Sequence, residues 1–254
     1  KDLKIEIHIY LERRCNVCYD PDHEIMVTVG GSEAIDAAMR AMIDPGDEVL
    51  IPQPSYVSYT PCCVLADGVP VIIELEEKDN FRLTPEKLLE KITPKTKILV
   101  LPFPNNPTGA IMEREDLEKI AEIVIEKDLY VISDEIYSEL TYAKEDHVTI
   151  ASLPGMKERT VLINGFSKAF AMTGWRLGYL ACPPALYQVV LKLFQHSISC
   201  TSGFLQRGAL TALDCVEETE QMRQAYEKRK NLLFEGIREI PGVELLTPAG
   251  AFYA

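Results

Sequence analysis

Hydrophobic residues occur along this chain in short runs that alternate with segments in which they recur at helical spacing. The short runs are bounded by polar or turn residues and predict buried strands. They lie at residues 24–29, 48–51, 69–75, 97–103, 129–133, 160–163 and 178–181. The helical spacing predicts helices at residues 33–43, 86–92, 113–127, 184–197 and 217–240, and a helical segment after Tyr56.

The first 14 residues fit two patterns. Ile5, Ile7 and Ile9 alternate as in a strand, yet Ile7 also shares one helical face with other apolar residues. The charged residues Glu12-Arg13-Arg14 follow, and they favour the end of a helix.

Strands that alternate with helices indicate βαβ units, so we expect a three-layer α/β/α fold with a mixed, mostly parallel sheet. The pattern changes at about residue 216, where a long and highly charged helical run begins. Two apolar runs follow it, at residues 243–246 and 251–253, and they predict strands of a new element. We therefore expect a large domain over residues 1–215. Residues 216–254 are expected to form a connecting helix and the start of a smaller α+β domain.

The charge and hydropathy of the chain exclude several classes of partner. The 254 residues include 26 basic and 39 acidic side chains, a net charge of −13. Nucleic acids and anionic membrane surfaces are bound by basic faces, so neither is an expected partner. No apolar run approaches the ~20 residues of a membrane-spanning helix. The first residues lack the apolar core of a signal peptide.

The seven cysteines do not predict a disulfide framework in a chain of this length. Cys15 and Cys18 form a CxxC pair, but no second pair accompanies it at the spacing of a structural zinc site. The four histidines are scattered. We expect no metal site, and a soluble protein in the reducing cytoplasm.

The candidate chemistry begins with Lys168, which lies with Ser167 in the loop after the strand at 160–163. Arg176 follows eight residues later. Open α/β sheets bind ligands at the carboxyl ends of their parallel strands, which is where this lysine is expected. A lone lysine is more often a solvated surface charge. The interpretation therefore depends on its companions.

Three other loops that follow strands carry suitable polar groups. Gly30-Gly31-Ser32 opens a helix, whose amides and hydroxyl suit a phosphate, although its spacing matches neither a P-loop nor G-x-G-x-x-G. Asn106-Pro107-Thr108-Gly109 offers an amide, and Asp134 and Tyr137 offer a carboxylate and a phenol. Each loop alone could be an ordinary turn or helix cap. Their convergence on one sheet edge favours a binding site.

These loops and the string SKAFAMTGWRLGY at 167–179 together resemble the fold-type I, pyridoxal-phosphate-dependent class I/II aminotransferases. The resemblance covers residues 1 to 254 and points to the branch of aspartate, aromatic and broad-range enzymes. It implies the large domain of that fold and pyridoxal 5'-phosphate as the cofactor. It also implies amino-acid and 2-oxo-acid substrates, and a homodimer with its active sites at the subunit interface.

The resemblance assigns a role to each of five residues around the cofactor ring. Lys168 is the Schiff-base lysine and general base. Asp134 pairs with the pyridine nitrogen and keeps it protonated. Asn106 and Tyr137 donate hydrogen bonds to the phenolate oxygen, and Tyr56 stacks on the ring face. The catalytic residues implied are Lys168, Asp134 and Tyr137.

The resemblance places the cofactor phosphate on the amides of Gly31 and Ser32, the Ser32 hydroxyl and the Arg176 guanidinium. The family often has a serine three residues before the lysine, where this chain has Gly165. Ser167 is assigned the corresponding hydroxyl.

The activity implied is amino transfer between an L-amino acid and a 2-oxo acid in a ping-pong cycle. Two alternatives remain open: a C–S β-lyase of the same fold, and a non-catalytic ligand-sensing module. The substrates are open as well. The family's early glycine segment and its α-carboxylate-binding arginine have no match in the chain. We therefore expect a central fragment that holds cofactor but transaminates poorly.

Overall fold

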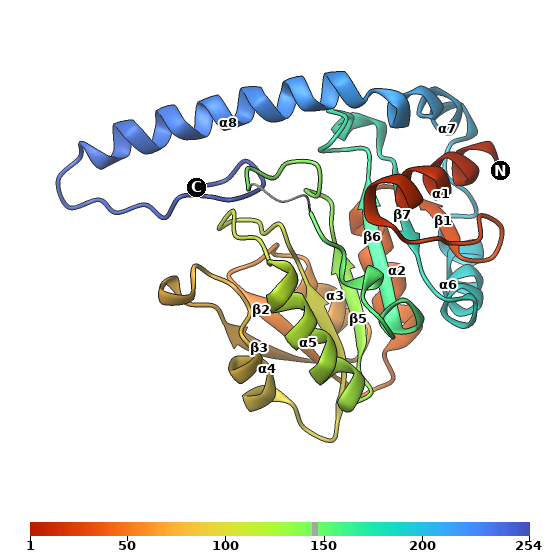
Figure 1. Cartoon of the computed structure of the whole chain (residues 1–254). Helices are drawn as coiled ribbons and strands as arrows, with labels where there is room; N and C mark the ends of the chain where they lie inside the picture. Colours follow the sequence, from red (N-terminus) through yellow and green to blue (C-terminus); the bar gives the residue numbers. More distant parts are fainter. Residues whose placement is uncertain (144–146) are drawn as a thin grey trace.

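The computed structural model describes residues 1–143 and 147–254 and contains a seven-stranded sheet (Figure 1). The strand order is β1-β7-β6-β5-β4-β2-β3. Only the β7 pairings are antiparallel among those described, with β1 and with β6. The strands are β1 (Ile25–Thr28), β2 (Glu48–Gln53), β3 (Val69–Glu74), β4 (Thr96–Leu101), β5 (Tyr130–Asp134), β6 (Thr160–Gly165) and β7 (Gly178–Ala181).

Helices cover both faces of the sheet, which confirms the predicted three-layer, mostly parallel α/β/α fold. The α-helices are α1 (Asp2–Cys15), α2 (Gly31–Met42), α3 (Tyr59–Leu65), α4 (Pro85–Lys91), α5 (Arg114–Glu126), α6 (Pro184–Ser197), α7 (Gly203–Gly208) and α8 (Val216–Arg238). Short 3-10 helices lie at Glu77–Asp79, Ile150–Ser152, Lys157–Arg159, Thr173–Trp175 and Leu210–Asp214. The first 14 residues, whose pattern was ambiguous, are helical. Helix α7 was not predicted from the sequence.

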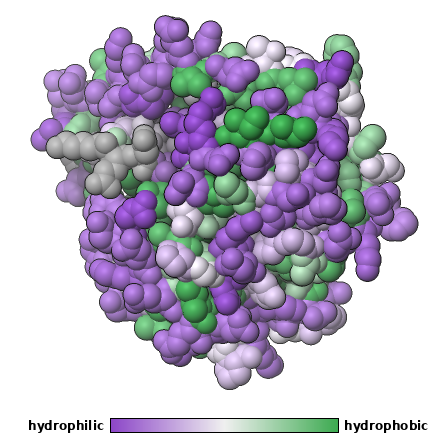
Figure 2. Space-filling view, turned by 45° about the vertical axis from the view of Figure 1, so that its right-hand side comes forward, coloured by the Kyte–Doolittle hydropathy of each residue, from purple (hydrophilic) through white to green (hydrophobic). Residues whose placement is uncertain are grey.

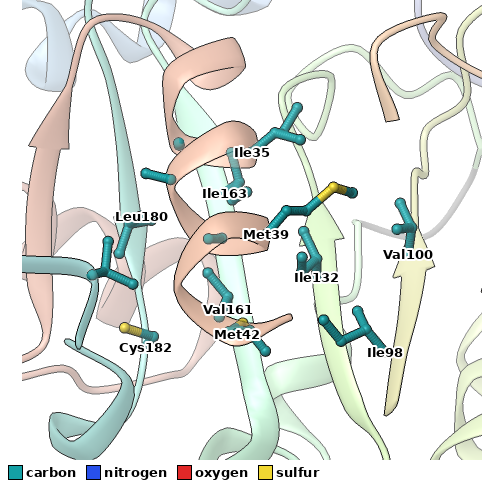
Figure 3. Packing of buried hydrophobic residues seen from close by; sticks show 14 of the residues in the cluster. Ile35, Met39, Met42, Ile98, Val100, Ile132, Val161, Ile163, Leu180 and Cys182 are labelled. Atoms are coloured by element: carbon teal, nitrogen blue, oxygen red, sulfur yellow. The ribbon is translucent and has the colours of Figure 1, made fainter. Parts of the chain in front are cut away.

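The core follows the two-residue period of the strands. In β4, Ile98 and Val100 face α2, whereas Leu99 and Leu101 pack in the cluster that includes α5. Figure 3 shows part of the first of these layers, in which side chains of α2 pack with side chains of β4, β5, β6 and β7. Its labelled residues are Ile35, Met39, Met42, Ile98, Val100, Ile132, Val161, Ile163, Leu180 and Cys182. Burial on both faces explains why the strands are nearly continuous apolar runs.

One edge of the sheet gathers the ends of the parallel strands. Four strands that run parallel to one another finish at this edge: β2, β4, β5 and β6. Strand β1 finishes there too, because it runs antiparallel to β7 and β7 runs antiparallel to β6. β7 therefore begins there, and the residues just before Gly178 lie beside the residues just after Thr28, its partner in the ladder. We call this the strand edge.

After α8 the chain turns back beneath the helix toward the sheet (Figure 1). The strands predicted at residues 243–246 and 251–253 are wrong, since neither segment is a strand. Ala251 has a positive φ of 56°, which an extended strand does not allow. Backbone hydrogen bonds join Ala249 and Gly250 to Gly109, and Ala251 to Leu140. We call residues 248–253 the tail segment.

The surface is predominantly hydrophilic on the face shown in Figure 2, where the apolar patches are small and separate. Among the described residues, no helix is both long enough and apolar enough to cross a membrane.

Candidate functional site

A cavity of about 340 Å³ lies at the strand edge. All nine predicted site residues line it: Gly31, Ser32, Tyr56, Asn106, Asp134, Tyr137, Ser167, Lys168 and Arg176. Five different segments supply them, which follow β1, β2, β4, β5 and β6, and the last of these leads into β7. The fold thus brings together polar groups that are up to 145 positions apart in sequence, from Gly31 to Arg176.

A larger cavity of about 430 Å³ lies between α1, the loop after β5 and α8. Its charged groups already neutralise one another. Arg14 makes two hydrogen bonds to Glu139, at 2.9 and 2.8 Å. Arg223 pairs with Glu220 at 2.7 Å and with Glu227 at 3.1 Å. The cavity at the strand edge is therefore the better candidate for a charged ligand.

At one end of that cavity, bare backbone makes room for an anion. A Cβ atom on Gly178 would lie 2.5 Å from the carbonyl carbon of Gly30 and 2.7 Å from the amide nitrogen of Gly31. A Cβ on Gly30, where φ is +79°, would lie 2.5 Å from Nη2 of Arg176. The glycines thus let the first turn of α2 and the guanidinium approach each other. Helix α2 starts two residues earlier than predicted, so that Gly31 and Ser32 lie in this turn.

The groups at this end are hydrogen-bond donors. The start of α2 presents unpaired amides and the positive end of the helix dipole. The Ser32 hydroxyl lies 3.4 Å from the Tyr56 hydroxyl, and Arg176 donates to the carbonyl of Thr173 at 3.0 Å. Within residues 1–143 and 147–254, no carboxylate pairs with Arg176. We call Gly30, Gly31, Ser32, Arg176 and Gly178 the anion cradle.

The buried carboxylate of Asp134 lies at the end of β5, with 7% of the residue exposed. It accepts hydrogen bonds from the Tyr59 hydroxyl at 2.7 Å and from the amide of Ile136 at 3.2 Å. Burial raises the pKa of Asp134 above its ordinary value, although these two hydrogen bonds oppose the shift. A cationic group in the cavity would offset this desolvation.

The amine of Lys168 lies among aromatic rings. Its Nζ is 5.2 Å from the ring centroid of Phe252 and 5.5 Å from that of Tyr137. Lys168 has no carboxylate partner among the described residues. It is therefore available to react with a ligand in the cavity. Ser167 beside it is buried. A Cβ on Gly165 would lie 2.7 Å from the Cα of Gly178, so the serine often found there in the family does not fit.

The loop after β4 is shaped by Asn105 so that Asn106 lines the cavity. The Asn105 side chain accepts hydrogen bonds from the amide of Thr108 at 3.1 Å and from its hydroxyl at 2.8 Å. It also donates to the carbonyl of Pro102 at 3.3 Å. Asn105 is completely buried, whereas Asn106 is partly exposed. The two neighbouring amides thus have different functions, one structural and one available to a ligand.

Three aromatic residues of the site were not predicted. Tyr59 bonds Asp134, and its spacing of three from Tyr56 was a signal that both could lie on one side of a short helical turn. Tyr253 lines the cavity, where its hydroxyl is 2.9 Å from that of Tyr137. Phe252 packs edge-on against Tyr137 with 5.3 Å between ring centroids. No local pattern indicated the last two, because they come from the tail segment.

The donor set fits pyridoxal phosphate, the cofactor that the resemblance implies. The anion cradle suits its phosphate, and a buried carboxylate suits its protonated ring nitrogen. The Lys168 amine lines the same cavity, which suits attachment at the cofactor's carbonyl carbon.

Comparison with known proteins gives consistent matches over the whole chain. The family model described as aminotransferase class I and II matches residues 1–254. An aspartate aminotransferase of Pyrococcus abyssi is 42% identical over 255 residues, which cover 99% of this chain and 65% of that protein. An aspartate aminotransferase of Geobacillus stearothermophilus is also 42% identical, over 253 residues, 99% of this chain and 64% of the relative.

Solved structures give the same result. The aromatic aminotransferase from Pyrococcus horikoshii has a TM-score of 0.96 at 41% identity, over 98% of this chain and 67% of that structure. The chain spans about 65% of the length of the curated relatives that it matches.

Proposed function

The chain belongs to the aminotransferase class I and II family, which confirms the resemblance seen in its sequence, and on this premise we propose that the protein is a pyridoxal-phosphate-dependent aminotransferase. It moves an amino group from an L-amino acid to a 2-oxo acid. One observation carries the proposal: the Lys168 amine, the Asp134 carboxylate and the anion cradle line a single cavity.

The residues of the cavity hold the cofactor at three points. The cradle amides, Ser32 and Arg176 bind its phosphate. Asp134 pairs with the ring nitrogen, and Asn106 and Tyr137 donate to the phenolate oxygen. When bound, the cofactor supplies a carbonyl carbon that takes up the amino group and a ring that accepts electrons from the substrate α-carbon.

Lys168 has two functions in this proposal. Its amine would anchor the cofactor covalently. When not attached to the cofactor, Nζ would act as the general base that takes and holds the proton of the substrate α-carbon, and in the second half-reaction it would give a proton to the α-carbon of the new amino acid. The rings of Phe252 and Tyr137, 5.2 and 5.5 Å from Nζ, flank this amine in the cavity. The oxo acid leaves before the second substrate binds, so the cycle is ping-pong.

The proposal is tested by adding pyridoxal phosphate to the purified chain, reducing with borohydride and mapping the labelled peptide. We expect a visible absorbance band and a label on Lys168. Lys168→Ala should remove both and lower amino transfer by roughly 10⁴-fold. Lys192→Ala, at an exposed position of α6, should change neither. A label elsewhere, or no band, would overturn the proposal.

A second assay separates amino transfer from β-elimination, since a lyase of this fold keeps the same lysine and aspartate. A panel of L-amino acids with 2-oxoglutarate should give the corresponding oxo acids. Pyruvate and ammonia released from cystathionine without an oxo-acid acceptor would identify the lyase instead.

We propose further that the protein acts in the cytoplasm, as its composition predicts, and that it forms a homodimer with active sites at the interface, as the resemblance implies. Sedimentation of the purified protein tests the dimer. A monomer that still binds the cofactor with full affinity would contradict it.

A further inference from the structure

We propose that Tyr253 is a positioning residue, which orients and polarises the Tyr137 hydroxyl so that Tyr137 donates its proton to the cofactor's phenolate oxygen. The inference deepens the proposed function and rests on it. It concerns a residue of the tail segment that neither the loop motifs nor the family matches single out.

The two hydroxyl groups are in direct contact. The oxygen atoms of Tyr137 and Tyr253 lie 2.9 Å apart, and their ring centroids lie 5.8 Å apart at 79°. Both side chains line the cavity that holds Lys168 and Asp134. Tyr137 is only 5% exposed, so few other partners can reach its hydroxyl. Tyr253 is thus a built-in hydrogen-bond partner for it.

The tail segment holds Tyr253 in this place by a set of backbone hydrogen bonds. The amides of Ala249 and Gly250 donate to the carbonyl of Gly109 at 2.9 and 2.8 Å. The amide of Ala251 donates to Leu140 at 2.8 Å, and that of Tyr142 donates to Ala249 at 2.8 Å. The segment therefore joins the loop that carries Asn106 to the loop that carries Tyr137.

Phe252 fixes the other side of the segment. Its ring stacks on Tyr226 of α8, with 5.4 Å between centroids and 27° between planes, and it packs against Tyr137. In Figure 1 the C-terminal part of the chain lies beneath α8, consistent with this contact. The Tyr253 hydroxyl is thus placed by packing on one side and by backbone bonds on the other.

The direction of the hydrogen bond follows from counting protons. A tyrosine hydroxyl has one proton to donate and can also accept a hydrogen bond. If Tyr137 gives its proton to the phenolate oxygen, the proton in the 2.9 Å contact must come from Tyr253. A hydroxyl that accepts a hydrogen bond becomes a stronger donor, because bonds in a chain polarise one another. Tyr253 therefore strengthens the bond from Tyr137 to the cofactor.

The strength of this hydrogen bond is expected to affect the pKa of the bound cofactor. A donor to the phenolate oxygen stabilises the form of the bound cofactor that has lost its proton and so lowers its pKa. Weakening Tyr137 as a donor must raise that pKa. Tyr253→Phe keeps the ring and its packing but removes the hydroxyl, so it tests the hydrogen bond alone.

The experiment follows the absorbance band of the cofactor-loaded chain as a function of pH. We expect Tyr137→Phe to raise the pKa of the band, Tyr253→Phe to raise it by less, and the double variant to match Tyr137→Phe. Tyr142→Phe is the matched control. It removes a hydroxyl that anchors the same segment at the carbonyl of Ala251, outside the cavity, and should leave the pKa unchanged.

The outcomes separate this inference from the proposed function. If Tyr137→Phe shifts the band and Tyr253→Phe does not, or if the two shifts add fully in the double variant, Tyr253 is not a positioning residue. An equal shift in Tyr142→Phe would assign the effect to loosening of the tail segment and overturn the inference too. Absence of any cofactor band in the unmodified chain would instead overturn the proposed function.

Discussion

The two walls of the candidate site, the anion cradle and the tail segment, are built in different ways. The cradle lies where β1 meets β7, and Thr28 pairs with Gly178 in their ladder. At Gly178 its close contacts join backbone to backbone. The tail segment has no strand ladder, and it is held by separate hydrogen bonds to two loops. One wall is part of the central sheet, and the other is attached to it.

Because of this difference, substitutions in the two walls should change different properties of the protein. Disturbing the cradle must disturb the sheet, because a packed backbone cannot move without its neighbours. The tail segment can shift while the sheet stays folded, since local openings cost less than global unfolding. Substitutions in the cradle should therefore lower the free energy of unfolding or the affinity for an anion. Substitutions in the tail segment should act mainly through Tyr253.

The largest expected effect is that of Gly178→Ala. The new Cβ would lie 2.5 Å from the carbonyl carbon of Gly30, where both partners are backbone. We expect the free energy of unfolding in urea to fall by about 3 kcal/mol. Gly174→Ala is the control, because apart from its chain neighbours no atom of the described residues lies within 4 Å of its Cβ position, and it should change stability by less than about 0.5 kcal/mol. Equal losses of stability in both variants would show that the close backbone contacts of the cradle are not the cause of the effect at Gly178.

Arg176→Ala should come next, with an effect on binding more than on folding. Loss of a charged hydrogen-bond donor costs about 1.5–3 kcal/mol, so the affinity for pyridoxal phosphate should fall roughly 10- to 100-fold in an equilibrium titration. The unfolding free energy should hardly change, because Arg176 is exposed. Arg114→Ala, in the first turn of α5, is the control for the loss of one positive charge. An unchanged affinity in Arg176→Ala would show that the cradle does not bind the phosphate.

Gly250→Ala is the counterpart of Gly178→Ala in the tail segment. Its Cβ would lie 2.8 Å from the Cβ of Pro104 and 2.9 Å from Cγ2 of Ile111. The two nearest obstacles are side-chain atoms, the backbone oxygen of Leu140 is farther away at 3.3 Å, and the segment itself can move, so we expect a loss of only about 1–2 kcal/mol. The pKa of the cofactor band should also move toward that of Tyr253→Phe. A loss as large as that of Gly178→Ala would make the two walls equivalent.

The same contrast explains what could be predicted from the sequence. The strands of the sheet are short apolar runs, and the helices that cover it have apolar residues at helical spacing. The α/β/α fold therefore followed from local patterns. The cradle residues, Asn106, Asp134 and Lys168 all lie at the end of a strand or within a few residues of one. Once the strands were placed, the parallel topology brought these residues to one edge.

The tail segment could not be predicted in this way. Its apolar residues suggested a strand at 251–253, but the backbone partners of the segment are loops and not neighbouring strands. Tyr253 meets Tyr137 across 116 positions of sequence. No local pattern encodes such a contact, because it depends on how α8 and the following turn return the chain to the sheet.

The smallest expected effect is that of Tyr142→Phe, which isolates one attachment of the tail segment. The Tyr142 hydroxyl donates to the carbonyl of Ala251, and burial raises the pKa of Tyr142 to about 12, so it remains a donor at ordinary pH. Its removal should lower the free energy of unfolding by about 1 kcal/mol, the usual contribution of one hydrogen bond. The cut rate in limited proteolysis near the C-terminus should rise more than this loss alone accounts for, because the segment opens locally. If proteolysis instead tracks global unfolding, the tail segment belongs to the same cooperative unit as the cradle, and the distinction between the two walls fails.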